Sequence, residues 1–184
     1  MSLARAILSR LAAADEAVLR FAVKLRAPAA TIAMRCVTML GDAGVFWFAA
    51  AAILLAAQKT RRRGAELVLC LAVSSVVNNG ILKNLIKRPR PYDVLPGVRA
   101  LIGSPAGFSF PSGHTAVAFA AAYAIFHGFG WRLGVPAYIV AAGIAASRVY
   151  LGVHYPSDAL AGIAAGILCA ALALKLPLAF LERL

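Results

Sequence analysis

The chain has 184 residues, of which 62% are hydrophobic and 14% charged, and its mean hydropathy is +0.82. This apolar content exceeds what a soluble domain of that length needs for its core, and it also excludes a disordered chain. Nineteen basic against seven acidic residues give a net charge of +12, which in so apolar a chain favours anionic lipid, and not nucleic acid, as the partner. We therefore expect a single all-α membrane domain over residues 1–184, with about five or six transmembrane helices.

The first 40 residues predict helices that lie on the membrane surface. Leu3, Ile7 and Leu11 recur at helical spacing, while basic residues occupy other positions on the helical wheel. Residues 1–35 contain six such cations, too many for a segment that crosses a bilayer unaided. An amphipathic helix among the lipid headgroups is the expected structure.

Five apolar segments predict membrane-spanning helices that together form a catalytic bundle over residues 41–175. They cover residues 43–58, 65–82, 110–126, 133–147 and 159–174. Each uncharged core is roughly 16 residues long, or about 24 Å of helix, so the polar ends must complete each crossing.

The five spans alternate between the two sides of the membrane. This alternation puts one face at residues 83–108 and 148–158, and the other at 59–63, 127–132 and 175–184. Three basic residues of the first face are interpreted below as ligand-binding, which leaves three cations there against seven on the second face. The positive-inside rule then predicts that the first face is external in a multi-pass protein of the cell membrane. A sixth crossing through residues 28–42 stays open, and with it the side of the N-terminus.

Three short polar segments stand at the ends of these spans on the predicted external face. They are Lys83 with Arg90-Pro91, then Pro111-Ser112-Gly113-His114, and finally Arg148 with His154 and Asp158.

Lys83 and Arg90 are seven residues apart, but the prolines on either side of Arg90 end the helix, so the two cations can converge. Together with Arg148 they predict a phosphate site. Lys87, Arg88 and Arg99 are interpreted instead as ordinary basic flanks of the membrane spans.

The second segment lies where the polar loop enters the third span. The N–H groups of a first helical turn bind phosphate, and the Ser112 hydroxyl is expected to point the same way. Gly113 would let an oxyanion approach the backbone closely. His114 is an ionisable residue at the apolar entry of a span, which predicts a function.

In the third segment, Pro156 is a suitable first residue for the fifth span, which puts Asp158 in its first turn within reach of His154. A carboxylate on one imidazole nitrogen fixes the tautomer and leaves the other nitrogen free as a nucleophile. His114, His154 and Asp158 could also suggest a metal site, but three nearby cations would repel a divalent ion. Neither a metal nor another cofactor is expected.

Taken together, the three segments resemble the signature of the type 2 phosphatidic acid phosphatase superfamily, membrane lipid phosphatases that share a core with soluble vanadium haloperoxidases and bacterial acid phosphatases. The resemblance covers residues 83–158 by motif and implies metal-independent phosphoryl transfer.

The expected activity is hydrolysis of a terminal phosphate from a lipid phosphate or diphosphate through a phosphohistidine intermediate. Lys83, Arg90, Arg148, Ser112 and Gly113 would bind the phosphate, His154 oriented by Asp158 would attack it, and His114 would protonate the leaving group. Polyprenyl diphosphate, phosphatidic acid and phosphatidylglycerophosphate all fit. A lipid phosphotransferase and a small non-enzymatic transporter are the alternatives.

Overall fold

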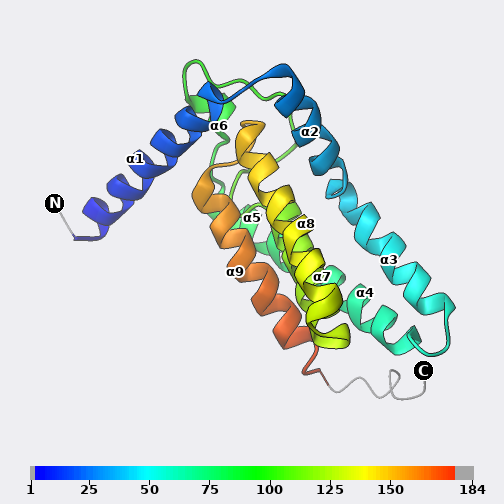
Figure 1. Cartoon of the computed structure of the whole chain (residues 1–184). Helices are drawn as coiled ribbons and strands as arrows, with labels where there is room; N and C mark the ends of the chain where they lie inside the picture. Colours follow the sequence, from blue (N-terminus) through cyan, green and yellow to red (C-terminus); the bar gives the residue numbers. More distant parts are fainter. Residues whose placement is uncertain (1–2, 177–184) are drawn as a thin grey trace.

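The computed structural model describes residues 3–176, and all of the regular secondary structure within them is helical, as expected (Figure 1). The N-terminal part comprises α1 (Leu3–Lys24), α2 (Pro28–Met39), the 3₁₀ turn η1 (Asp42–Gly44) and α3 (Val45–Ala56). The remaining elements are α4 (Arg61–Ser75), the π-helical η2 (Val76–Leu82), α5 (Lys83–Ile86), α6 (Pro91–Val94), α7 (Gly113–Phe129), α8 (Trp131–Tyr150) and α9 (Pro156–Ala173).

Several of these helices have the character of membrane spans. By length and composition, Arg61–Val94, Trp131–Tyr150 and Pro156–Ala173 could each cross a membrane, and Val45–Ala56 is a shorter apolar helix. The five predicted spans correspond to α3, α4 with η2, α7, α8 and α9, with ends shifted by a few residues. The chain thus folds as a membrane helix bundle, and the number of crossings stays a prediction.

Helix α7 lies at the centre of the bundle and packs against α4, α8 and α9. Its contact with α9 depends on small residues, because a Cβ at Gly162 would lie 2.7 Å from the carbonyl oxygen of Ser112. Gly166 faces the backbone of Ala116 one turn further along, where a Cβ would lie even closer to the carbonyl oxygen. Close backbone approach through small residues is how helices associate in lipid, and here it brings the N-termini of α7 and α9 together.

The helix that begins as α4 continues through η2 into α5 and so delivers Lys83 to the site. Residues 76–82 form a π-helical stretch, a local irregularity that is often found at functional sites. The buried Asn78 donates from its side-chain amide to the carbonyl oxygen of Ser74, 2.8 Å away. The neighbouring Asn79 accepts a hydrogen bond from Lys83 Nζ at 3.3 Å.

The N-terminal helices differ from each other in their relation to the bundle. Helix α1 leaves the bundle at an angle (Figure 1) and exposes Ile7, Leu8 and Phe21, which agrees with an amphipathic surface helix. Helix α2 instead packs along α8 and continues through η1 toward α3. The sequence predicts surface helices over residues 1–40, but α2 contacts the bundle. Its Thr38 is buried there, and the Thr38 hydroxyl accepts a hydrogen bond from Arg148.

Candidate active site

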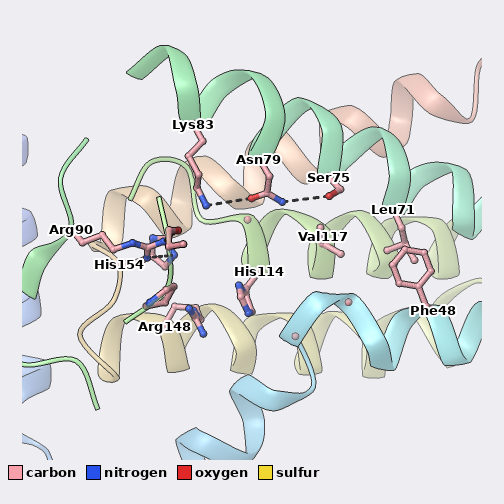
Figure 2. Close-up of a pocket in the computed structure, with 15 residues that line it drawn as sticks. Phe48, Leu71, Ser75, Asn79, Lys83, Arg90, His114, Val117, Arg148 and His154 are labelled. Carbon is pink, nitrogen blue, oxygen red and sulfur yellow. Dashed lines mark hydrogen bonds between the residues drawn. The ribbon is translucent and has the colours of Figure 1, made fainter. Parts of the chain in front are cut away.

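A cavity of about 220 Å³ opens at the end of the bundle where α5, α7 and the loop before α9 meet. Six of the eight site residues predicted from the sequence line it, namely Lys83, Arg90, Gly113, His114, Arg148 and His154. Figure 2 shows Arg90, His154 and Arg148 at one end of the cavity and Phe48 with Leu71 at the other. The cavity therefore has a cationic end and an apolar end.

Arg90 is 2% exposed, and its side chain is held by several hydrogen bonds. Its guanidinium donates to the carbonyl oxygens of Gly107 at 2.9 Å, Ala106 at 3.2 Å and Val153 at 3.0 Å. These acceptors are neutral, so the positive charge of Arg90 is not cancelled by a carboxylate. An anion in the cavity can therefore interact with it at little reorganisation cost.

Arg148 is even more deeply buried, at 1% exposure, and its hydrogen bonds are incomplete. One terminal nitrogen donates to Thr38 Oγ1 at 2.7 Å, whereas the buried Nε has no hydrogen-bond partner in the part of the chain that the structure describes. An unsatisfied buried donor of a charged group is costly. Arg148 also lines the cavity, so its positive charge can act on an anion there.

His154 and Asp158 form the pair that the sequence predicts. His154 Nδ1 lies 3.5 Å from Asp158 Oδ2, and the same carboxylate oxygen accepts hydrogen bonds from the Ser109 hydroxyl and from the backbone N–H of Tyr155. His154 Nε2 lies 3.4 Å from a terminal nitrogen of Arg90. An arginine can only donate, so these partners assign the proton to Nδ1 and leave the lone pair on Nε2, where it lies beside Arg90 in a residue that lines the cavity.

Burial governs the protonation of His154. Desolvation lowers its pKa to about 3, and the charges of Arg148 and Arg90 act in the same direction, while Asp158 opposes them. The imidazole is therefore neutral near pH 7. A neutral imidazole with an unprotonated Nε2 is the form that can act as a nucleophile.

His114 is the second residue of α7 and has a partner that the sequence did not suggest. Its Nε2 lies 2.9 Å from Oδ1 of Asp42, a residue of η1. An ionised carboxylate can only accept a hydrogen bond, so this contact assigns a proton to Nε2. The contact orients the His114 ring at the edge of the cavity, across from His154 in Figure 2.

Ser112 and Asp158 do not line the cavity. The Ser112 hydroxyl is fully buried and accepts a hydrogen bond from Thr115 Oγ1 at 2.9 Å, so the expected orientation of this hydroxyl toward phosphate is not seen. The reason is that Thr115, in the first turn of α7, is the hydrogen-bond partner of this hydroxyl. The backbone N–H of Ser112 donates to the carbonyl oxygen of Asp158 at 3.0 Å and joins α7 to α9.

Arg88 is the main residue that was misinterpreted from the sequence. It is no ordinary basic flank, because its guanidinium donates to Asp158 Oδ1 at 2.7 Å and to Asp15 Oδ2 at 2.7 Å. The guanidinium also lies 3.9 Å above the centre of the Tyr155 ring. A sequence signal existed in the acidic pair Asp15-Glu16, which lies on a helix whose other charged residues are basic.

The comparisons with known proteins agree with this geometry. Residues 63–181 match the family model of the PAP2 superfamily. The undecaprenyl-diphosphatase of Sulfolobus acidocaldarius is 31% identical over 119 residues, which are 63% of this chain and 56% of that protein. The decaprenylphosphoryl-5-phosphoribose phosphatase of Mycolicibacterium smegmatis is 32% identical over 136 residues, covering 73% of this chain and 72% of the relative.

A solved structure gives the same result for the fold. The crystal structure of a transmembrane PAP2 type phosphatidylglycerolphosphate phosphatase from Bacillus subtilis superposes with a TM-score of 0.75 and 28% identity. The superposition covers 95% of this chain and 88% of the other. The chain belongs to the PAP2 superfamily, and the resemblance drawn from its three motifs is confirmed.

Proposed function

We propose that the protein is a metal-independent lipid phosphatase that hydrolyses a terminal phosphate through a phosphohistidine on His154. The observation that carries this proposal is the Asp158-paired imidazole of His154, whose unprotonated Nε2 lies at a cavity lined by Lys83, Arg90 and Arg148. The names of the relatives, all phosphatases of membrane lipids, support it.

In the first step, His154 Nε2 attacks phosphorus while the bond from phosphorus to the leaving oxygen breaks. His114 acts in its doubly protonated form: it keeps the Nε2 proton toward Asp42 and gives the proton of its other nitrogen to that oxygen, so the leaving group departs as a neutral alcohol or a protonated phosphate. The three cations neutralise the charge on the equatorial oxygens of the phosphoryl group. They supply the positive charge for which other phosphatases use a metal ion.

In the second step, water replaces the histidine. His114, now neutral, takes a proton from the water as its oxygen attacks phosphorus and the bond to Nε2 breaks. Inorganic phosphate leaves, and both histidines return to their starting protonation states. Asp158 stabilises the positively charged imidazole ring of the intermediate and keeps it oriented in both steps.

The substrate class follows from the two ends of the cavity. The cationic end fits a phosphomonoester or diphosphate, and the apolar end with Phe48, Leu71 and Val117 fits the first carbons of a lipid tail. The rest of the tail would remain in the bilayer. Polyprenyl diphosphates, phosphatidic acid and phosphatidylglycerophosphate share these features, and we place the site on the external face of the cell membrane because of the positive-inside count.

The direct test is phosphate release from a panel of these three lipids by the purified protein in detergent. We expect release from at least one of them by the wild-type protein and none by His154→Ala. His127→Ala is the matched control, because His127 is exposed on α7 far along the helix from His114, and this variant should retain full activity. Transfer of phosphate to a second lipid without free phosphate would indicate a phosphotransferase instead.

A further inference from the structure

Helix α1 makes a polar contact with the bundle that a surface helix does not require. Of its side chains from residue 5 onward, Asp15 and Leu19 are the buried ones, at 5% and 0% exposure, and they lie one turn apart on the same face. Leu19 packs against Val98 and Tyr155. Burying a carboxylate costs free energy unless it is paired and hydrogen-bonded, so the partners of Asp15 indicate its purpose.

Asp15 binds two elements of the site. One carboxylate oxygen accepts a hydrogen bond from the backbone N–H of Ser157 at 2.8 Å. The other accepts hydrogen bonds from the Ser157 hydroxyl and from Arg88, the latter at 2.7 Å. Ser157 lies in the first turn of α9, so Asp15 accepts a hydrogen bond from an N–H group that has no partner within the helix. Its negative charge at the helix N-terminus also interacts favourably with the helix dipole.

Arg88 carries this contact on to the nucleophile. Its guanidinium bridges Asp15 and Asp158, and it is further fixed by the Ser157 hydroxyl at 2.7 Å and by the ring of Tyr155. Asp158 divides its oxygens between two tasks. Oδ1 accepts from Arg88, and Oδ2 faces His154 Nδ1.

We propose that Asp15 is a positioning residue, which acts through Arg88 to hold the Asp158 carboxylate in the orientation that aligns His154. This inference rests on the proposed role of His154 as nucleophile. The planar guanidinium is suited to the task because it can donate to two carboxylates at once from fixed directions. Helix α1 is thereby a support of the catalytic pair and not an attachment to the membrane alone.

The proposal predicts a loss in turnover that is not caused by weaker substrate binding. Asp15 is not among the residues that line the cavity. With a short-chain phosphatidic acid in detergent, Asp15→Asn should therefore lower kcat by about ten- to a hundredfold, as is typical when a residue that orients a ligand from behind is replaced. KM should change little.

Two neighbouring variants serve as matched controls. Glu16→Gln removes the adjacent acid, which is paired with Arg20 at the exposed surface, and it should behave as the wild type. Leu19→Ala loosens the packing of α1 on the bundle but keeps the contacts of Asp15, and it should lower the melting temperature with a small effect on kcat. An equal loss of kcat in Leu19→Ala and Asp15→Asn would mean that Asp15 only anchors α1, and would overturn the proposal.

A double-mutant cycle tests whether Asp15 acts through Arg88. Lysine at position 88 keeps the charge but cannot bridge two carboxylates, so Asp15→Asn should cost much less in the Arg88→Lys background than in the wild type. Additive losses would contradict the proposal. A wild-type protein that releases no phosphate would instead refute the proposed function, and an active wild type with an unaffected Asp15→Asn would refute the role of Asp15 alone.

Discussion

Oδ1 of Asp42 lies 2.9 Å from Nε2 of His114, and this contact joins the turn before α3 to the first residues of α7. The two residues are 72 positions apart in the sequence. Because the carboxylate accepts the Nε2 proton and stabilises a positively charged ring, we expect Asp42 to help His114 carry a second proton, on its other nitrogen, for the leaving group. The proposed general acid therefore has its own carboxylate, as the proposed nucleophile has Asp158.

Replacing Asp42 should impair the step in which the leaving group departs. We expect His114→Ala to lower kcat by about 10²- to 10⁴-fold, as is typical when a general acid is removed. Asp42→Asn should lower kcat by a smaller factor. The defect should shrink with a nitrophenyl phosphate, whose leaving group needs little protonation. Equal defects with lipid and nitrophenyl substrates would argue against this role of Asp42.

The protonation state of His154 predicts an unusual pH profile. Its pKa is lowered to about 3 from the ordinary value of 6.5, so the nucleophilic neutral form is present above about pH 3 and is lost only as the pH falls through that value. The rate of phosphoenzyme formation from a nitrophenyl phosphate should hence stay nearly constant between about pH 7 and pH 5. Rapid-quench measurements that show a decline centred near 6.5 would contradict this assignment.

Metal removal should leave the reaction intact. The cations Lys83, Arg90 and Arg148 line the cavity and take the role that a divalent ion has in other phosphatases. Phosphate release should therefore persist in excess EDTA, and vanadate should inhibit because its trigonal bipyramidal form resembles the transition state. Activity that disappears with EDTA and returns with one divalent metal would refute the metal-independent mechanism.

The orientation in the membrane can be tested by labelling single cysteines in intact cells. Cys36 is exposed and must first be replaced by alanine. In that background, Ser104→Cys in the loop near the site should react with a membrane-impermeant thiol reagent, whereas Lys59→Cys at the opposite end should react only after the membrane is opened. The reverse pattern would place the site on the cytoplasmic side.

The sequence predicted the helices and most of the cavity for identifiable reasons. Uncharged runs locate the spans because a bilayer tolerates little else, and ionisable residues at their ends, such as His114 and His154, are conspicuous against them. Gly113 lines the cavity as expected, although the side chain that a Cβ at this position would meet is that of Asn79. Here the residue type was informative before the fold was known.

What the sequence could not reveal were the partners of these residues. Arg88 and Arg90 flank the same proline, and only the fold determines that Arg90 lines the cavity while Arg88 turns away to Asp158. Asp15 lies 73 positions from Arg88, so no local pattern joins them. The burial of the Ser112 hydroxyl beside Thr115 was likewise not visible in the sequence, because it depends on side-chain rotamers.

The central claim is that His154 Nε2 forms the covalent bond to phosphorus. It is tested most directly by rapid quench with ³²P-labelled lipid phosphate, followed by measurement of the label on the denatured protein. We expect acid-labile, base-stable label on the wild-type protein and none on His154→Ala. With ³²P-labelled nitrophenyl phosphate in place of the lipid, His114→Ala should still become labelled. Label that remains on His154→Ala and disappears from His114→Ala would show that the nucleophile and the acid have been exchanged, and would contradict the mechanism.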